Sequence, residues 1–426
     1  MLDEVIQLDK KYYLNTFGDR LPVCFEKGEG MKLFDDKGNT YYDFLGGIAV
    51  NAYFCGQTKY IVFHEKNYNY YDFLGGIAVN ALGHGHKDFI NALKNQLDKV
   101  VHTSSLYYIE NQAKLAQKLV ENTCAEKAFF ANSGAEANEG AFKLAKIYYY
   151  KKGLDKYEII TLDKSFHGRT LATVAATGQE KYQKPYRPLT PGFKQVEPNN
   201  FKAIEDAVTD KTAAIMIELI QGESGVHPMD KEYVEKLRKL CDEKDIILIF
   251  DEVQTGMGRT GYLFAHQMYG VEPDIFTSAK ALGGGIPIGA VCAGKKVASA
   301  FEPGDHGTTF GGNPFATAAG LAVFDIFEKE HLVENAGKMG KYFKEKLTEL
   351  QNKYSDKITD VRNAGLLIGI QLEDSIAKTV FNKLFENKML TSLCGGNTIR
   401  IAPPLIIKET DINIFIDTLN NILEEL

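Results

Sequence analysis

The stretches AAIMIELI at residues 213–220 and IILIFDEV at residues 246–253 decide the fold of this chain of 426 residues. Each is a continuous apolar run, as expected of strands in a parallel sheet that helices cover on both faces. Between them, YVEKLRKLCDEKD carries apolar residues at three- and four-residue steps, which predicts an amphipathic helix. KAFFAN at 127–132 and EIITLD at 158–163 are further strands of the same kind. The chain is therefore expected to have an α/β fold with a mostly parallel central sheet.

Composition and charge narrow the class of protein. The chain is 44% hydrophobic and 25% charged, and its length suggests two or three domains of about 150 residues each. A formal charge of -7 gives no basic field for nucleic acid. The N-terminus lacks a signal-peptide pattern and no 18 successive residues are apolar, so we expect a cytoplasmic protein without a membrane partner. The six cysteines form no CxxC pair and the nine histidines show no ligand spacing, so no metal site is expected.

The pattern along the chain suggests three parts. From about residue 325 it changes to long helices, and KLFDDKGNTYYDF near the start predicts a strand, a turn and a second strand. We expect residues 1–82 to form an N-terminal segment that joins a small domain, residues 83–325 to form a large domain, and residues 326–426 to complete a small α+β domain.

One segment is duplicated. YYDFLGGIAVNA occurs at residues 41–52 and again, letter for letter, at residues 70–81. A solenoid needs at least three stacked units, so this is a local duplication, although a faulty sequence assembly would leave the same letters. The short hairpin loop favours the first YYDF in the strand because closure is entropically cheap, whereas the second GGIAVNALGH runs directly into the next helix. We therefore expect about residues 45–74 to be looped out.

Small and polar residues follow the predicted strands, at the carboxyl ends where open α/β sheets bind their ligands. Ser133, Gly134 and Ala135 open a helix, whose free N–H groups and dipole suit a phosphate, although an ordinary helix start has the same letters. Asp251 ends a buried strand and needs a cationic or hydrogen-bonded partner. Lys280 follows an apolar stretch and precedes three glycines. In apolar surroundings a lysine loses its proton readily and becomes a nucleophile.

Two cofactors fit these features to different degrees. Gly256 to Gly261 is a literal GxGxxG after a strand, with Asp274 further along, as in dinucleotide sites. That fingerprint needs its glycines at the strand-to-helix turn, but DEVQT intervenes, so we disfavour a nicotinamide enzyme. A phosphate cradle, the carboxylate of Asp251, the loop aromatic Phe166 and the amine of Lys280 instead describe a site for pyridoxal phosphate.

Seven motifs carry a family resemblance: NSGAEANEGAFKLA, SFHGRT, IELIQGESG, DEVQTGMGRTG, SAKALGGGIPIGA, HGTTFGGNP and IRIAPPL. With them the chain resembles the class III pyridoxal-phosphate-dependent aminotransferases from about residue 11 to its C-terminus, and most closely the acetylornithine aminotransferases. The resemblance implies the type I fold of these transferases and a homodimer whose active sites lie at the subunit interface.

The same motifs imply roles for individual residues. The implied contacts with the cofactor phosphate are Ser133, Gly134 and Ala135, together with Thr309, which would reach the phosphate bound by the partner subunit. The implied contacts with the cofactor ring are Phe166 on its face, Asp251 at its nitrogen, Gln254 beside its hydroxyl, and Val253. Lys280 is the implied point of covalent attachment. The implied substrate contacts are Arg169 with a carboxylate, Thr308, Arg400 with the α-carboxylate of glutamate, and Glu223, which masks Arg400 when the ω-amino substrate is bound.

The resemblance also implies a reaction. The δ-amino group of N2-acetylornithine would pass to 2-oxoglutarate, giving N-acetylglutamate 5-semialdehyde and glutamate, a step of arginine biosynthesis. Phe17 and Ile77 (or Ile48) stand where tyrosines are expected in ornithine aminotransferases, and an apolar pocket suits the N-acetyl group. Ornithine, succinylornithine and 4-aminobutyrate stay open as donors because the related enzymes share nearly every motif. A cofactor-binding homologue that the insertion has inactivated is the alternative from another class.

Overall fold

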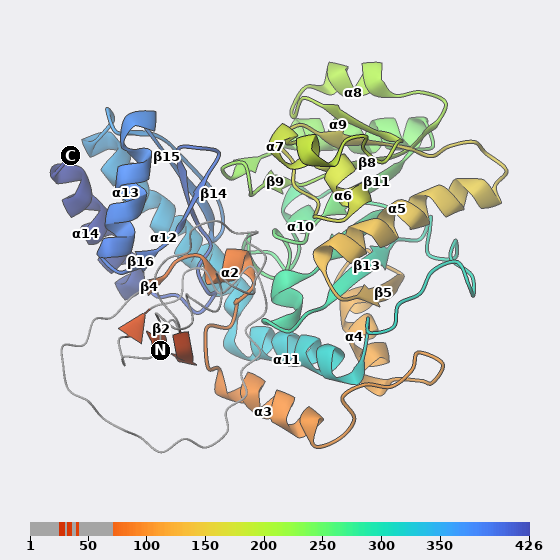
Figure 1. Cartoon of the computed structure of the whole chain (residues 1–426), viewed down its shortest axis with the longest axis horizontal. Helices are drawn as coiled ribbons and strands as arrows, with labels where there is room; N and C mark the ends of the chain where they lie inside the picture. Colours follow the sequence, from red (N-terminus) through yellow and green to blue (C-terminus); the bar gives the residue numbers. More distant parts are fainter. Residues whose placement is uncertain (1–24, 30–31, 36–39, 42–70) are drawn as a thin grey trace.

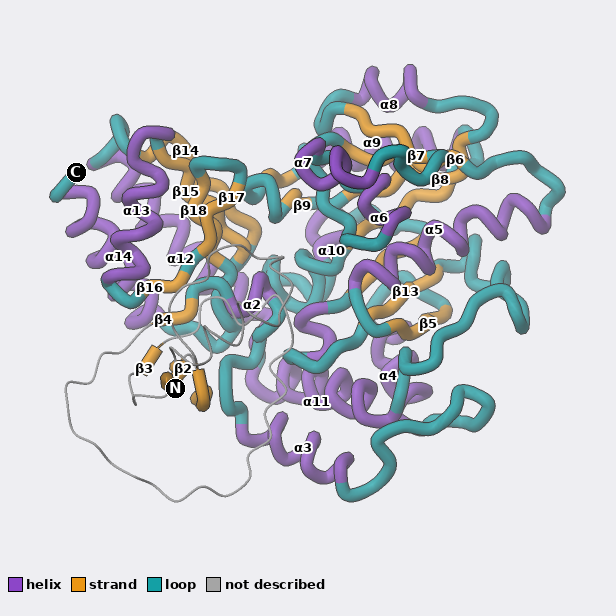
Figure 2. The backbone as a smooth tube through the Cα atoms, in the orientation of Figure 1, coloured by secondary structure: helices purple, strands orange, loops and turns teal. Residues whose placement is uncertain are grey.

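The computed structural model of the protein describes residues 25–29, 32–35, 40–41 and 71–426. Figure 1 shows the two groups of elements side by side: the large sheet with its helices, and a smaller group that contains the C-terminus. Figure 2 shows that helices lie around the strands of the large group, whereas the helices of the smaller group lie on one side of its strands. Among the described residues, no helix combines the length and the apolar character that a membrane span requires.

The large sheet has seven strands in the order β5-β13-β12-β11-β8-β6-β7. Their bounds are β5 Lys127–Ala131, β6 Glu158–Leu162, β7 Phe193–Val196, β8 Thr212–Ile217, β11 Ile247–Asp251, β12 Ile275–Ser278 and β13 Gly289–Ala293. β11 pairs in parallel with β8 and β12, and β6 pairs in parallel with β7 and β8. The predicted α/β fold with a mostly parallel sheet is therefore confirmed.

One edge of this sheet differs from the expectation. β13 runs antiparallel to both of its neighbours, β12 and β5. The KAFFAN strand, expected in a parallel sheet, thus pairs antiparallel instead. β13 was not predicted because GAVCA is short, rich in small residues and bounded by glycines, so it resembles a loop.

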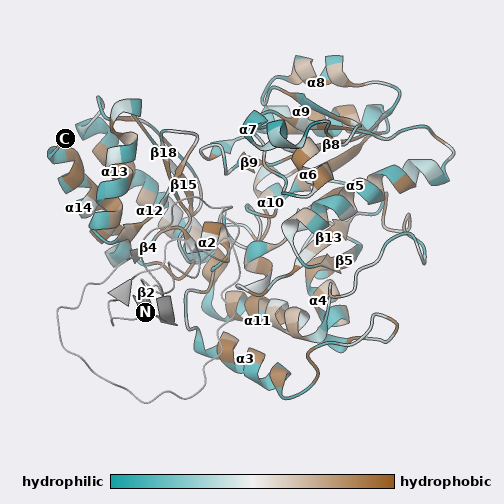
Figure 3. Ribbon diagram, viewed as in Figure 1, coloured by the Kyte–Doolittle hydropathy of each residue, from teal (hydrophilic) through white to brown (hydrophobic). Residues whose placement is uncertain are grey.

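Helices cover the large sheet on both faces. The helices of the large group are α3 Lys87–Leu97, α4 Glu110–Glu121, α5 Gly134–Lys151, α6 Leu171–Ala176, α7 Glu180–Gln183, α8 Phe201–Ala207, α9 Lys231–Glu243, α10 Ala265–Tyr269 and α11 Pro314–Glu330, with short 3-10 turns η1 Lys184–Tyr186 and η2 Lys280–Gly283. α9 is the helix predicted between the two opening strands, and it buries Val234, Leu237 and Leu240. In Figure 3 hydrophobic and hydrophilic residues alternate along α3 and α5, as expected of helices with one buried face.

The smaller group is built on a four-stranded antiparallel sheet in the order β14-β15-β18-β17. Its strands are β14 Ile358–Ala364, β15 Leu367–Leu372, β17 Ser392–Cys394 and β18 Thr398–Ile401, and its helices are α12 Leu332–Lys353, α13 Asp374–Glu386 and α14 Glu409–Glu424. α14 begins beside Thr410 and buries Ile412, Phe415 and Leu419, the predicted apolar face. The predicted domain boundaries, at residues 82/83 and 325/326, stay predictions.

The N-terminal hairpin forms as predicted. β1 Phe25–Glu29, β2 Lys32–Asp35 and β3 Thr40–Tyr41 make an antiparallel sheet, so the start of the first repeat copy continues the hairpin. Residues 42–44, the rest of the first YYDF, and residues 45–70 lie outside the described residues.

The second copy corrects the predicted insertion. Residues 71–74 were expected to be looped out, but β4 Tyr71–Asp72 pairs in parallel with β16 Met389–Leu390. Phe73 is fully buried, and its ring meets Phe415 and Phe343 at centroid distances of 4.5 and 5.8 Å. The prediction failed because it weighed loop closure alone, about 0.6 kcal/mol per doubling of length, and ignored the larger gain from burying an aromatic ring.

Asp72 and the turn that follows tie the second copy further into the fold. One oxygen of Asp72 accepts the N–H groups of Leu74 and Gly75, at 3.0 and 2.7 Å. The short helical turn α2, Gly75–Ala78, then holds Ile77 at a φ of 59°. A β-branched residue at positive φ is unfavourable, so its surroundings must hold this turn in place.

Candidate active site

Strand register brings the predicted site segments together at the carboxyl ends of the parallel strands of the large sheet. Asp251, the last residue of β11, lies opposite Thr277 near the end of β12. Gly289, the first residue of β13, lies opposite Ala131 at the end of β5. Lys280 begins η2 two residues after β12 ends. The helix start, the carboxylate and the lysine therefore gather where the parallel strands end.

The start of α5 is fixed by close backbone packing. Ser133 is its N-cap, and the Ser133 hydroxyl accepts the N–H of Glu136 at 3.2 Å. The N–H groups of Gly134 and Ala135 belong to the first turn, which has no intrahelical acceptors. A Cβ on Gly289 would lie 2.2 Å from the carbonyl oxygen of Ser133, and a Cβ on Gly134 would lie 2.7 Å from Val253. Glycine at both positions lets the turn sit against β13 and Val253.

Asp251 is buried within a hydrogen-bond network. Its Oδ2 atom lies 2.8 Å from Nδ1 of His167 and accepts the side-chain amide of Asn138 at 2.8 Å. The same amide group donates to the carbonyl of His167, and its oxygen accepts the hydroxyl of Thr277 at 2.7 Å. The other carboxylate oxygen accepts the N–H of Val253 at 3.0 Å. The predicted partners of Asp251 therefore exist, and they fix the orientation of the carboxylate.

Lys280 has the environment that the sequence indicated. Burial, together with the positive charge of Arg400, lowers the pKa of its amine to about 8, although the carboxylates of Glu223 and Asp251 oppose the shift. Its φ is 47°, an uncommon value for a residue other than glycine. At pH 7 about a tenth of this amine is then uncharged, as a nucleophile or base must be, far more than for an ordinary lysine.

Glu218 is a buried acid that the sequence analysis did not select. It accepts the N–H of Phe166 at 2.7 Å. Burial and the nearby charge of Asp251 raise its pKa to about 7, although His167 and Lys280 oppose the shift. The available signal was a single carboxylate inside the apolar run AAIMIELI. Asn138 and His167 were also missed, although both lie in quoted motifs, because a motif does not reveal which side chains pair.

Phe166 and Arg169 lie on the loop between β6 and α6, and Tyr182 of α7 packs against both. The rings of Phe166 and Tyr182 meet edge to face at 5.6 Å. The guanidinium of Arg169 is exposed and lies 4.1 Å from the centre of the Tyr182 ring and 5.5 Å from that of Phe166. Arg169 is thus held by aromatic faces and presents its charge to solvent.

The predicted pair of Glu223 and Arg400 is present. Nη1 of Arg400 donates to Glu223 at 3.1 Å and to the side-chain oxygen of Gln254 at 3.3 Å, and Nε donates to the Ser392 hydroxyl. Burial would raise the pKa of Glu223, but Arg400 and Lys280 outweigh it and hold that pKa below its usual range. Arg400 is almost wholly buried, whereas a fifth of the Glu223 side chain (21%) is exposed. Glu223 is therefore the more exposed partner of the pair.

Thr308 and Thr309 have different surroundings. The Thr308 hydroxyl accepts the side-chain amide of Asn132 at 3.4 Å, which puts it beside the start of α5. Thr309 is exposed, and the ring of Phe310 after it is 62% exposed. Phe17 and Ile48 lie outside the described residues.

Glu252 lies next to Asp251 but belongs to a separate cluster. It is fully buried and accepts Nδ1 of His266 at 2.7 Å. Burial would lower the pKa of His266, but its contacts with Cys124 and Glu252 outweigh this and raise the pKa to about 9. This ion pair ties α10 to the end of β11.

Comparison with known proteins identifies the family. Residues 56–423 match the sequence model of the family described as Aminotransferase class-III. The chain belongs to the class-III aminotransferases. It is thus an enzyme that uses pyridoxal phosphate, and the expected activity class and cofactor are confirmed.

Relatives of this class-III aminotransferase cover its whole length. An acetylornithine aminotransferase of Methanocaldococcus jannaschii is 46% identical over 99% of this chain and 98% of its own. Among solved structures, an acetylornithine aminotransferase from Elizabethkingia anophelis is 32% identical with a TM-score of 0.82, covering 100% of this chain and 99% of its own. An ornithine aminotransferase from Toxoplasma gondii is 28% identical with a TM-score of 0.88, covering 100% and 95%. The fold of a type I transferase is therefore confirmed.

Proposed function

We propose that this enzyme transfers the δ-amino group of N2-acetylornithine to 2-oxoglutarate. The observation that carries the proposal is the pair of Glu223 and Arg400 beside Lys280, in a chain 46% identical to an acetylornithine aminotransferase. An arginine that is masked by a movable carboxylate suits an enzyme that must accept a dicarboxylate in one half-reaction and an amine in the other.

The residues at the carboxyl ends of the parallel strands fit pyridoxal phosphate. The N–H groups of Gly134 and Ala135, with the Ser133 cap, would hold its phosphate at the start of α5. Asp251, oriented by Asn138 and His167, would pair with the ring nitrogen. Phe166 would cover one ring face, and Val253 and Gln254 would lie beside the ring.

Lys280 would attach the cofactor and move the proton. When bound, the cofactor supplies an electron-accepting ring that stabilises the negative charge formed beside the substrate nitrogen. Lys280 would remove the proton from that carbon and return it at the end of the half-reaction, a role for which a pKa of about 8 is suitable. Asp251 would keep a negative charge beside the ring nitrogen while the proton moves.

Substrate recognition would depend on charge and on an apolar wall. Arg400 would bind the α-carboxylate of glutamate once Glu223 turns away, and Arg169 would bind a second carboxylate from the exposed loop. Ile77, partly buried against the core in the second repeat copy, would provide an apolar surface for the N-acetyl group. Thr308, beside the start of α5, would lie near the substrate.

We also propose a homodimer in the cytoplasm. Leu106, Tyr107 and Phe310 are large apolar residues that are 88%, 69% and 62% exposed in one subunit, as expected of a surface that a second subunit covers. Thr309, exposed next to Phe310, would then reach the phosphate in the partner subunit. Sedimentation at micromolar concentration tests the dimer, and a monomer with full activity would contradict it.

A parallel assay tests the reaction. The holoenzyme is given 2-oxoglutarate with N2-acetylornithine, ornithine, succinylornithine or 4-aminobutyrate, and glutamate formation is followed. We expect kcat/KM to be highest for N2-acetylornithine. A preference for ornithine would instead assign the activity of the Toxoplasma relative. Cofactor binding without turnover of any of the four amines would indicate that the insertion has inactivated the enzyme.

A further inference from the structure

The loop that carries Glu223 is the tip of a small hairpin. β9 Ile220–Gln221 and β10 His227–Pro228 pair antiparallel, and residues 222–226 connect them. Arg400 holds the first half of this tip, since it donates to the carbonyl of Gly222 at 3.2 Å and to Glu223. The position of Glu223 therefore depends on what holds the second half.

Arg362, from β14 of the small group, holds that second half through the main chain. Its Nε donates to the carbonyl of Val226 at 3.0 Å, and its Nη2 donates to the carbonyl of Gly225 at 2.9 Å. The opposite edge of the guanidinium is fixed by Asp360 at 2.6 Å and by the side chain of Gln371 at 2.7 Å. Both edges of the planar group are thus used, an arrangement that the single ammonium of lysine cannot reproduce.

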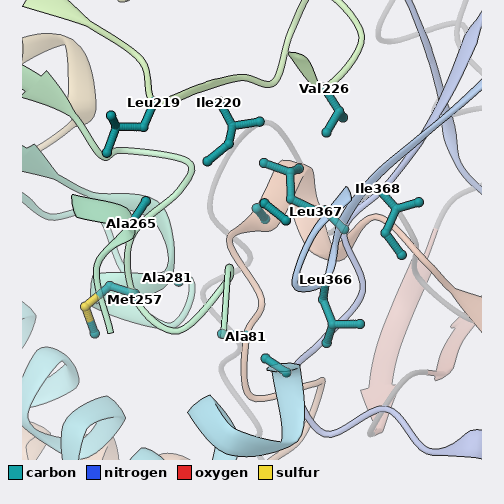
Figure 4. Packing of buried hydrophobic residues seen from close by; sticks show 14 of the residues in the cluster. Ala81, Leu219, Ile220, Val226, Met257, Ala265, Ala281, Leu366, Leu367 and Ile368 are labelled. Atoms are coloured by element: carbon teal, nitrogen blue, oxygen red, sulfur yellow. The ribbon is translucent and has the colours of Figure 1, made fainter. Parts of the chain in front are cut away.

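The main chain at this point needs to be held. Val226 is fully buried and has a φ of 59°, which is unfavourable for a β-branched residue. Figure 4 shows Val226 on the side of the loop that faces Leu367 and Ile368 of β15. A Cβ on Gly369 would lie 2.7 Å from the Gly225 carbonyl and 3.1 Å from the Val226 Cβ, so the loop rests directly on the strand.

We propose that Arg362 is a positioning residue for substrate specificity: it fixes the backbone of residues 225–226 so that Glu223 masks and unmasks Arg400 by moving its side chain alone. The inference rests on the proposed exchange of Glu223 between two positions. When Arg362 is lost, the loop drifts and Glu223 covers Arg400 less often. Binding of the amine donor then weakens, whereas binding of 2-oxoglutarate, which needs Arg400 uncovered, does not.

The kinetic test compares Arg362→Gln and Arg362→Lys with a matched control in the holoenzyme. We expect both variants to raise the KM for N2-acetylornithine about tenfold, the effect of losing one charge-assisted hydrogen bond. The KM for 2-oxoglutarate is expected to stay unchanged or to fall. The control is Arg238→Lys on α9, an arginine of similar exposure (18% against 15%) that pairs with Asp242 and Asp274. It should change neither KM.

A second measurement does not depend on turnover. Amide hydrogen exchange in Arg362→Gln should quicken at residues 224–227 and stay unchanged in β11 and β12, because only the loop loses its anchor. Should Arg362→Gln fold poorly, Arg362→Lys keeps the charge beside Asp360 and gives the same comparison.

The variant Glu223→Gln separates failure of this inference from failure of the proposed exchange. The role of Arg362 is overturned if Glu223→Gln shifts the ratio of the two KM values but Arg362→Gln and Arg362→Lys weaken both substrates equally. No shift in Glu223→Gln overturns the exchange itself. Unchanged hydrogen exchange at residues 224–227 also overturns the role of Arg362.

Discussion

The duplicated segment offers a test in which a residue is compared with its own copy. Phe73 is fully buried, with its ring edge to face against Phe415 at 4.5 Å and Phe343 at 5.8 Å. Truncating a buried phenylalanine costs about 3–5 kcal/mol, and the aromatic pairs favour the upper half of that range. We therefore expect Phe73→Ala to lower the free energy of unfolding by about 4 kcal/mol.

The matched control is Phe44→Ala, the same residue in the first copy. Because Phe73 already fills the site between Phe343 and Phe415, one site cannot hold both rings. We expect Phe44→Ala to change stability by less than about 1 kcal/mol. Urea unfolding followed by circular dichroism measures both, since the chain has no tryptophan to report by fluorescence. Equal costs, or a greater cost for Phe44→Ala, would refute the argument that the second copy supplies the core residue.

Further predictions concern the site and the repeat. Lys280→Ala should still bind pyridoxal phosphate, although dialysis should remove the cofactor more readily than from the unsubstituted enzyme. Its transamination rate should fall by about 10²–10⁴-fold, and activity above a few per cent would assign the base elsewhere. Asp251→Asn removes a charge worth about 4 kcal/mol at about 4 Å and an effective dielectric of 20, so the rate should fall about a thousandfold with the fold intact, as circular dichroism would check. Deleting residues 45–73 leaves one complete copy, and the product should fold and be at least as active; loss of activity would make the repeat an integral part of the enzyme. For His266, the folded pKa of about 9 exceeds the ordinary 6.5, so about 3 kcal/mol of stability is present below pH 6.5 and is lost as pH rises through 9. Urea midpoints at pH 6 and pH 9.5 measure this, and His266→Gln should flatten the dependence.

Local patterns predicted much of the fold and the site. The apolar runs at 213–220 and 246–253 became β8 and β11, because a strand buried on both faces needs continuous apolar sequence. Ser133 was found at a helix start and Lys280 at a strand end because both depend on neighbours in the sequence.

Features that depend on distant contacts were missed. The pairing of His167 with Asp251, and that of Arg362 with the Val226 carbonyl, join segments that no spacing rule connects. The place of Phe73 was also decided at long range, by Phe343 and Phe415. A sequence window can show that a group is buried or polar, but the partner is chosen by the folded chain.

The pairing of β4 with β16 sets an order of events during synthesis. Tyr71–Asp72 leaves the ribosome early, but its partner, Met389–Leu390, is among the last segments made. At about 10 residues per second the interval is about half a minute. Phe343, which covers the aromatic ring of Phe73 on one side, is made only near the end of that time, and Phe415 is made after it. A nascent chain of this enzyme therefore exposes an aromatic segment near its beginning until late in synthesis, and a truncated chain that ends before β16 lacks both β16 and Phe415 to cover that segment.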